Sequence, residues 1–160
     1  MPNRHRGSDD ERRVLDAYVK LSRALATVDA AIHRPLGDAG LTASRFGALE
    51  ALWHLGPLNP RDLGRKILKS SGNVSVVVDG LERDGLVARE RDPADRRNVI
   101  VSLTDAGRSR IEAVYPAHVA RLVASFAHLH TDDVDRLAAL AKTLGTRHAL
   151  ESPTPQEEPA

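Results

Sequence analysis

The chain has 160 residues, of which 41% are hydrophobic and 28% charged, so it can build one domain with a packed core and is too apolar for global disorder. The absence of cysteine excludes disulfides, thiolate zinc sites and thiol redox sensing, and 3% aromatic residues argue against a stacking platform for single-stranded nucleic acid. The net charge is +1 and no apolar run reaches the roughly 18–20 residues of a membrane span, so we expect a soluble, cytoplasmic protein that makes no membrane contact.

The first predicted element is a helix of some 25 residues that ends before Pro35 and Gly37. Ser8 and Glu11 have the spacing of a capping box, in which each residue satisfies a free backbone amide of the other. Apolar residues then recur mostly at helical spacing: Val14, Leu15, Tyr18, Val19, Leu21, Leu25, Val28 and Ile32. A domain this small cannot bury so long a helix fully, so we expect it to pack against something else.

Three shorter helices are predicted next. Each begins after a side chain that caps a helix N-terminus: Thr42, Asn59 before Pro60, and Ser70 or Ser71. Their ends are predicted at Gly56-Pro57, at about Ile67, and at Asp84 with Gly85 in the C′ position. The third of these helices covers residues 73–84.

The hydrophobic period then changes to that of β-structure. Short β-prone runs at 86–91 and 98–103 flank a polar turn at 92–97, which predicts a hairpin. A long helix is expected over residues 104–129, with a kink at Pro116 because proline removes a backbone hydrogen bond.

A last helix is expected from Thr131 to about His148, with a favourable acidic first turn. The tail that follows is rich in Pro and Glu, and we expect it to be disordered.

The middle of the chain has the layout of a helix-turn-helix. Residues 59–110 carry eleven Lys and Arg against eight Asp and Glu, so the basic excess lies there. The second helix opens with small polar residues, which can approach the floor of a DNA major groove. We predict phosphate contacts from the basic side chains Arg61, Lys66 and Lys69, and base-edge contacts from Ser71, Asn73, Ser75 and Val76. Ser70 is a further DNA-binding candidate of this segment. A solvated helix face is the alternative that charge alone would favour.

The hairpin offers a second DNA contact. Arg91, Arg96 and Arg97 cluster at its turn, and arginine at a hairpin tip fits the narrow, electronegative minor groove. Asp95 is spaced to pair with Arg97 and to hold the tip. An Arg- and Asp-rich turn taken alone would be read as a solvated loop, but its position directly after a helix-turn-helix favours a DNA-binding wing.

Three segments of the chain resemble the MarR family of bacterial winged-helix transcription regulators: 61–63, 71–86 and above all 92–107. The last holds an Asp-x-Arg wing motif and a strand that ends in Leu-Thr-x-x-Gly. The resemblance covers about residues 10–148. It implies a homodimer in which the first and the last two helices interlock and two winged lobes bind the half-sites of a palindrome. It also implies that Arg97 and Asp95 are the paired wing residues.

Residues 66–74 resemble the branch of the family that senses phenolic or quinone-like compounds. Without cysteine, any sensing must use reversible ligand binding. Family pockets lie between the dimer helices and the winged lobe, and the candidates there are His33, Arg45, Phe46, Trp53 and His54. Core packing remains an alternative for Trp53, and a satisfied or partly exposed histidine is an alternative for His54.

Two other functions receive little support from the sequence. His118, His128 and His130 lack the i, i+4 spacing that places two imidazoles on one helix face, so we predict no metal site, although a metal-sensing regulator stays open. We find no Gly-rich phosphate loop, Gly-x-Ser-x-Gly or His-Glu-x-x-His motif, and therefore expect no enzyme, no catalytic residue and no cofactor.

The prediction is a mainly α fold with a small β-hairpin wing, a winged helix-turn-helix with long dimerisation helices at both ends. The expected divisions are an N-terminal dimerisation helix, a DNA-binding domain, C-terminal dimerisation helices and a disordered tail, at residues 8–36, 42–103, 104–150 and 151–160. The expected function is a ligand-responsive repressor that binds double-stranded DNA as a homodimer, with a small aromatic or phenolic effector. A protein–protein docking module is the alternative.

Overall fold

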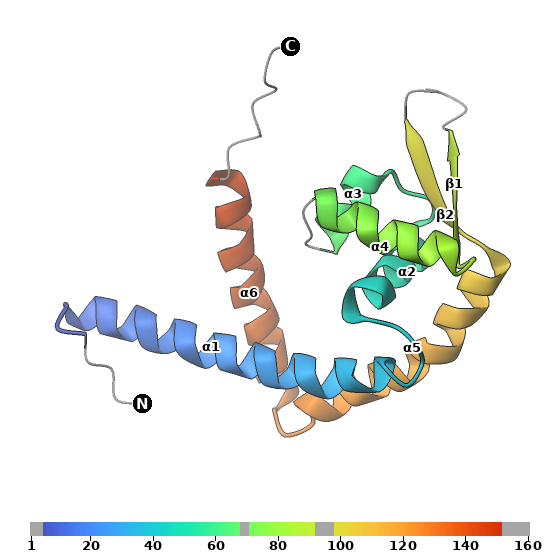
Figure 1. The fold of residues 1–160 in the computed structure, drawn as a ribbon. Coiled ribbons are helices and arrows are strands. Elements are labelled where there is room, and N and C mark those ends of the chain that lie inside the picture. The colour runs from blue at the N-terminus through green and yellow to red at the C-terminus, as the bar shows by residue number, and fades with distance from the viewer. Residues whose placement is uncertain (1–4, 68–70, 92–97, 152–160) are drawn as a thin grey trace, which may run out of the picture. The chain divides into compact units, whose positions relative to one another are not determined.

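The structure is a computed structural model that describes residues 5–67, 71–91 and 98–151 (Figure 1). In chain order its elements are α1 (Asp9–His33), the short 3-10 helix η1 (Arg34–Leu36), α2 (Ala43–Leu55), α3 (Pro60–Lys66), α4 (Ser71–Arg83), β1 (Val87–Arg91), β2 (Val99–Leu103), α5 (Asp105–Phe126) and α6 (Thr131–Glu151). The chain forms two compact units with a boundary between Leu122 and Val123. The predicted fold class, mainly α with a small β-hairpin, is confirmed.

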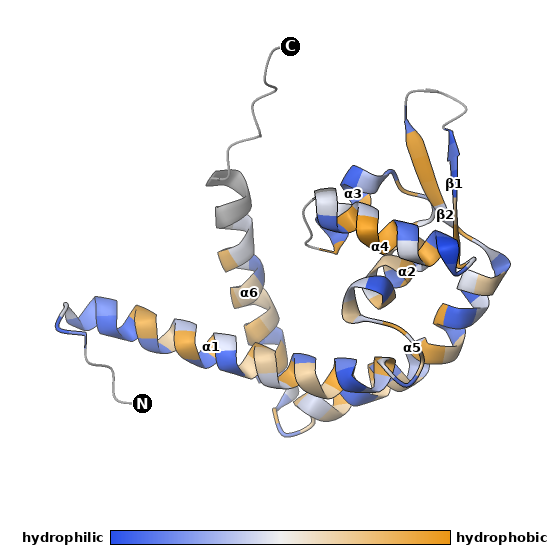
Figure 2. Ribbon diagram, in the orientation of Figure 1, coloured by the Kyte–Doolittle hydropathy of each residue, from blue (hydrophilic) through white to orange (hydrophobic). Residues whose placement is uncertain are grey.

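Helix α1 begins at the predicted capping box. The Glu11 N–H donates to the Ser8 hydroxyl at 3.2 Å, and the Ser8 N–H donates to the Glu11 carboxylate at 2.7 Å. Among the 25 residues of α1, Ile32 alone is buried. Apolar segments recur along the helix (Figure 2), and its large exposed side chains are Val14, Leu15, Tyr18, Val19 and Leu25. Each of these side chains is at least 38% exposed, so the described part of the chain does not cover them fully.

The hydrophobic core lies in the winged lobe, the name used below for α2, α3, α4, the hairpin and the start of α5. Its largest fully buried side chains are Phe46, Leu49, Leu63, Leu81, Ile111, Val74, Val78 and Val101. They come from four helices and from β2, so burial of one shared apolar cluster fixes these elements against one another.

The end of α4 is closed by the glycine that the sequence places there. Gly85 has a φ of 70°, a left-handed conformation that glycine adopts without steric cost. Its N–H donates to the Glu82 carbonyl at 2.9 Å, and the Leu86 N–H donates to the Leu81 carbonyl at 2.9 Å. This pair of bonds is a Schellman motif, so the predicted C′ position of Gly85 is confirmed.

The hairpin is a two-stranded antiparallel sheet whose register runs from Val87↔Leu103 to Arg91↔Val99. Leu58 adds an isolated bridge on the other side of β2, with two bonds to Val101 of 3.0 and 2.8 Å. Strand β1 begins at Val87 and not at Leu86 as predicted, because the Leu86 N–H already serves the end of α4. The second helix of the predicted helix-turn-helix, called the reader helix below, differs too: α4 begins at Ser71, two residues before the predicted start.

The Leu-Thr-x-x-Gly motif joins the hairpin to α5. The Thr104 hydroxyl donates to the Gly85 carbonyl at 2.7 Å and accepts from the Gly107 N–H at 3.0 Å. A Cβ atom on Gly107 would lie 1.9 Å from the Leu86 carbonyl oxygen. The motif therefore selects glycine because the first turn of α5 touches the backbone between α4 and β1.

Helix α5 continues through Pro116, where one backbone N–H is missing, and its ribbon curves in Figure 1. It ends at Phe126, before the predicted Leu129, because i→i+3 bonds such as Leu129 N–H to the Phe126 carbonyl at 2.9 Å take over there.

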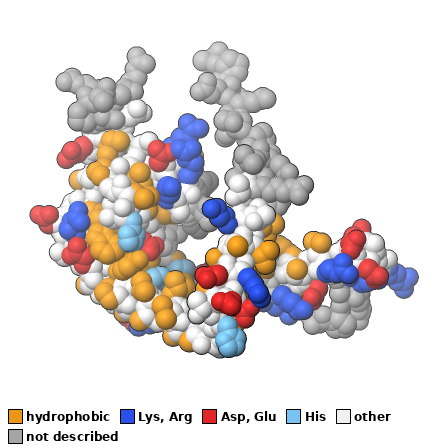
Figure 3. All heavy atoms as spheres, turned by 180° about the vertical axis from the view of Figure 1, so that it is seen from behind, with side chains coloured by type: hydrophobic (Ala, Val, Ile, Leu, Met, Phe, Trp, Pro, Cys, Tyr) orange, Lys and Arg blue, Asp and Glu red, His pale blue; other side chains and the backbone are white. Residues whose placement is uncertain are grey.

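In the second unit, α6 begins with the predicted acidic first turn of Asp132 and Asp133 and runs to Glu151, past the predicted end at His148. Three of its leucines are exposed: Leu137, Leu140 and Leu144. In the space-filling view, hydrophobic side chains reach the surface among charged ones (Figure 3).

Candidate nucleic-acid interface

Helix α4 has a buried face and an exposed face. Val74, Val78 and Leu81 lie in the core, whereas Asn73 and Val76 are exposed, Val76 to 71%. The buried valines and leucine hold the helix in place, so its short exposed side chains stand on a fixed support. An exposed apolar residue beside an amide suits a major-groove floor, where thymine methyl groups and adenine edges are presented.

Six of the DNA-binding candidates have exposed side chains. Exposed side chains are found at Arg61 and Lys66 of α3, at Asn73, Ser75 and Val76 of α4, and at Arg91, the last residue of β1. Ser71 is the first residue of α4. The remaining candidates lie outside the described residues: Lys69, Ser70, Asp95, Arg96 and Arg97.

An arginine that the sequence analysis did not select links the hairpin to α4. Arg89 of β1 forms ion pairs with Asp79 and Glu82 of α4. In the sequence these residues are seven and ten positions apart on two different elements, and no local spacing rule pairs them.

Arg45, a predicted effector residue, is engaged inside the winged lobe. Its guanidinium forms an ion pair with Asp84 and donates to the Gly80 carbonyl at 3.3 Å. The Arg45 hydrogen bond holds the pKa of the Asp84 carboxyl below its usual value. The side chain thus ties the first turn of α2 to the last turn of α4.

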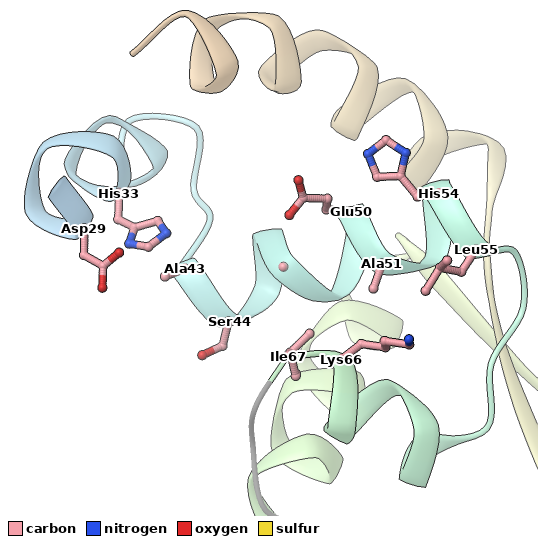
Figure 4. A pocket seen from close by; sticks show the side chains of 11 residues that line it. Asp29, His33, Ala43, Ser44, Glu50, Ala51, His54, Leu55, Lys66 and Ile67 are labelled. Atoms are coloured by element: carbon pink, nitrogen blue, oxygen red, sulfur yellow. The ribbon is translucent and has the colours of Figure 1, made fainter. Parts of the chain in front are cut away.

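A pocket of about 640 Å³ opens between α1, α2 and α3 (Figure 4). Of the five predicted effector residues, His33 and His54 line it. The other lining residues are Asp29, Ala43, Ser44, Gly47, Glu50, Ala51, Leu55, Lys66 and Ile67. Figure 4 shows Asp29 and His33 on the α1 side and Lys66 on the α3 side. The pocket thus offers two imidazoles, two carboxylates and one ammonium group.

The two pocket carboxylates, Asp29 and Glu50, were not among the residues predicted from the sequence. Asp29 and His33 stand four residues apart on α1, and Glu50 and His54 stand four apart on α2, so each pair shares a helix face. That i, i+4 spacing is the signal that could have found them. It does not show that the two pairs face a common space.

The two aromatic candidates are packed in the lobe. Phe46 is in the core. Trp53 packs against the core, with its ring centroid 4.7 Å from that of His54 and 4.9 Å from that of Tyr115. His54 is exposed, and its Nε2 lies 3.2 Å from the Tyr115 hydroxyl. Trp53 is the sole tryptophan of the chain, so its fluorescence reports on the surroundings of the pocket residue His54.

His118 of α5 is buried, with 7% of its surface exposed. Its ring lies 4.3 Å from Phe46 and 6.0 Å from His33, measured between centroids, and its Nδ1 has no hydrogen-bond partner among the described residues. Burial lowers the pKa of His118. Glu50 and a hydrogen bond with the Ile32 backbone oppose this shift, while the neighbouring His33 and Arg121 add to it. Burial therefore favours the neutral form of the ring.

We expect this burial to make stability depend on pH. Below about pH 6.5 the unfolded chain takes up a proton on His118 that the folded protein resists, so the free energy of unfolding falls as the pH drops from 7 toward 5.5. Urea unfolding at several pH values measures this slope. In the His118→Phe variant the slope over that window is expected to flatten, and an unchanged slope would contradict the assignment.

The structure also bears on the metal-site and membrane-span predictions. Within the described ranges, no group of three or more His, Cys, Asp or Glu side chains is placed to hold a metal ion. None of the helices in the part of the chain that the structure describes combines the length and hydropathy that a membrane span needs.

A helix pair with an exposed reader face, followed directly by a hairpin on the same core, defines a DNA-binding protein of the winged helix-turn-helix class. The sequence profile of the MarR family matches residues 41–99. The chain is 35% identical over 144 residues to the HTH-type transcriptional regulator YkoM of Bacillus subtilis, covering 89% of this chain and 94% of that protein. The chain belongs to the MarR family of transcriptional regulators.

Solved structures agree with this assignment. BpsR of Bordetella bronchiseptica, whose DNA binding is regulated by 6-hydroxynicotinic acid, has a TM-score of 0.74 at 28% identity, over 81% of this chain and 98% of that one. CouR of Rhodococcus jostii RHA1, solved with p-coumaroyl-CoA, has a TM-score of 0.74 at 25% identity, over 81% of this chain and 91% of that one.

Proposed function

We propose that the protein is a homodimeric, ligand-responsive repressor that binds a palindromic operator and occludes a promoter. The observation that carries the DNA-binding part is the exposed face of α4, held by buried Val74, Val78 and Leu81 beside exposed Arg61 and Lys66. Lys66 and Arg61 would contact phosphates while α4 meets base edges, and the hairpin tip would reach the minor groove.

The dimer is supported by apolar side chains that the monomer leaves exposed. Tyr18 of α1 is 67% exposed and Leu140 of α6 is 70% exposed, and further large apolar residues accompany each of them. Covering such surface with a second copy is favourable, and a two-fold dimer presents two readers to two half-sites. We therefore assign residues 8–36 and 104–150 to dimerisation and residues 42–103 to DNA binding.

The effector part rests on the pocket between α1, α2 and α3. Lys66 could pair with the carboxylate of a small aromatic acid, while His33 and Glu50 could hydrogen-bond a ring hydroxyl. Because Lys66 is also a candidate phosphate contact, an acid bound there would compete with DNA for the same ammonium group. The relatives BpsR and CouR, which respond to or bind aromatic compounds, support this class of effector.

The test is fluorescence anisotropy with a duplex enriched by the protein from a random library, compared with a scrambled duplex at several salt concentrations. Each lobe has three predicted phosphate contacts, Arg61, Lys66 and Lys69. For a dimer they predict a slope of about −5 when the logarithm of DNA affinity is plotted against the logarithm of salt concentration. Sedimentation in the same buffers gives the mass of the complex. A flat salt response, or a library in which no sequence is enriched, would favour the docking module instead.

The same complex tests the effector. Salicylate, hydroquinone or 6-hydroxynicotinic acid is expected to release the duplex and to change Trp53 emission. In the His33→Ala variant we expect the compounds neither to release the duplex nor to change Trp53 emission. Release is measured relative to the DNA affinity of this variant without compound. Release by none of the three compounds, with Trp53 emission constant, would contradict an aromatic effector in this pocket.

A further inference from the structure

The side chain of Arg89 connects two elements that meet DNA in the proposed function. Its Nη1 donates to Glu82 Oε2 at 2.9 Å and its Nη2 donates to Asp79 Oδ1 at 2.5 Å. Arg89 is the central residue of β1 and stands opposite Val101 in the hairpin. With 28% of its side chain exposed, it is the least exposed member of the three. We call this group the Arg89 bridge.

The two carboxylates of the bridge belong to the reader helix. Asp79 follows Val76 by three residues and Ser75 by four, so it lies one turn beyond the exposed reader residues on the same side of α4. Glu82 follows Asp79 by three. Left unpaired, both carboxylates would stand close to the phosphates that α4 approaches, where negative charge opposes binding.

The remaining links between α4 and β1 are a short turn and core packing. The turn passes through Gly85 with its positive φ, and Leu86 and Val87 are buried behind it. These contacts fix the base of the hairpin. The Arg89 bridge lies farther along β1, two residues beyond Val87 and toward the tip.

Arginine suits this task better than lysine. Its planar guanidinium presents separate N–H groups in a fixed fork, and here two of its nitrogens bind two different carboxylates. A lysine ammonium would keep the charge, but it is a point donor on a flexible stem and would not hold two carboxylates in one fixed geometry. An isolated surface ion pair contributes little, but one arginine shared by two carboxylates is a network that restricts both elements.

We infer that Arg89 is a positioning residue for DNA recognition: through Asp79 and Glu82 it holds the wing strand and the reader helix as one unit. This inference rests on the proposed DNA-binding function. Its consequence is that reader and wing fit an operator together, so that loss of the bridge lowers the preference for the operator over other DNA. Any effector would then move the two elements jointly.

The experiment compares the duplex enriched by the wild-type protein with its scrambled form, by anisotropy at fixed salt. The variants are Arg89→Ala, Arg89→Lys, the pair Asp79→Asn with Glu82→Gln, and the combination of that pair with Arg89→Ala. We expect the operator-over-scrambled affinity ratio to fall about tenfold in Arg89→Ala and also in the carboxylate pair. The combined variant should show the same ratio as Arg89→Ala alone, because all of these changes remove the same bridge. In Arg89→Lys the ratio should fall less than in Arg89→Ala.

The double variant Asp79→Asn with Glu82→Gln distinguishes a positioning role of Arg89 from mere neutralisation of charge. If Arg89 merely neutralised Asp79 and Glu82, removing those carboxylates would raise affinity for both duplexes and leave their ratio unchanged. If Arg89 contacted phosphate itself, Arg89→Ala would weaken both duplexes equally and reduce the salt slope. Either result would overturn the inference. Arg6→Ala, which removes an exposed arginine that precedes the proposed dimerisation segment, is the matched control for charge.

Thermal unfolding by circular dichroism shows whether each variant is folded. Should Arg89→Ala fail to fold, the Lys variant and the carboxylate pair still decide the question. If the wild-type protein enriches no sequence, the proposed function fails, and the inference fails with it. If the wild type selects an operator and the carboxylate pair keeps the wild-type ratio, only the inference fails.

Discussion

Replacing Arg97 with alanine is expected to weaken binding of the enriched duplex at least tenfold, which corresponds to about 1.4 kcal/mol. Arg97 lies in the segment that connects β1 to β2, beyond the last strand pair, Arg91↔Val99. An arginine at a hairpin tip can enter the minor groove, where the negative potential is strong and a charge-assisted contact contributes most.

Anisotropy titration of Arg97→Ala against the wild type measures this effect, with Arg6→Ala as the control for loss of one exposed positive charge outside the winged lobe. Asp95→Asn is expected to weaken binding as well, although it removes a negative charge. The reason is the predicted pairing of Asp95 with Arg97, which would hold the arginine in place. An affinity of Arg97→Ala equal to that of the wild type would remove the wing from the proposed interface.

Replacing Gly107 with alanine should destabilise the protein by about 1–3 kcal/mol, the usual range for overpacking. The new Cβ would stand 1.9 Å from the Leu86 carbonyl oxygen and 2.9 Å from its carbonyl carbon. These are backbone atoms held by the Leu86 hydrogen bonds to Leu81 and Thr104, so they cannot rotate away as a side chain could. Either α5 or the start of the hairpin must move.

Urea unfolding at pH 7 measures the loss. Gly80→Ala in α4 is the matched control, since a Cβ there meets nothing nearer than the end of the Arg83 side chain at 3.9 Å, and the same substitution should stabilise that helix by about 0.5–1 kcal/mol. Opposite signs for the two variants are therefore expected. A Gly107→Ala protein as stable as the wild type would contradict the close approach of α5 to Leu86.

Several elements of the fold could be predicted because their signals are local. The capping box of Ser8 and Glu11, the caps at Thr42 and Asn59, and the glycine that ends α4 each act within one helical turn. The chain itself brings such partners together, so sequence spacing is enough to identify them. Two of the boundaries that differed, at Leu86 and Leu129, are places where one N–H had two possible acceptors.

The candidate site was predictable to a different degree in each of its parts. The positions of the basic and small polar residues on α3 and α4 follow from helical periodicity, because the residues that face the core and those that face solvent alternate with a known period. Periodicity could not show that Arg45 would bind Asp84, 39 residues away, or that Lys66 would share a pocket with Asp29 and His33.

Neighbours along the chain specify the helices, the hairpin, the wing motif and the exposed reader face of α4, so these features could be predicted from the residues alone. The pairing of charges on different elements follows from the packed fold: Arg45 binds Asp84, and Arg89 binds Asp79 and Glu82. Such pairs cannot be predicted from spacing, because ion pairs form between groups within a few ångströms in space. That distance is set by how α2, α4 and the hairpin pack on one shared core.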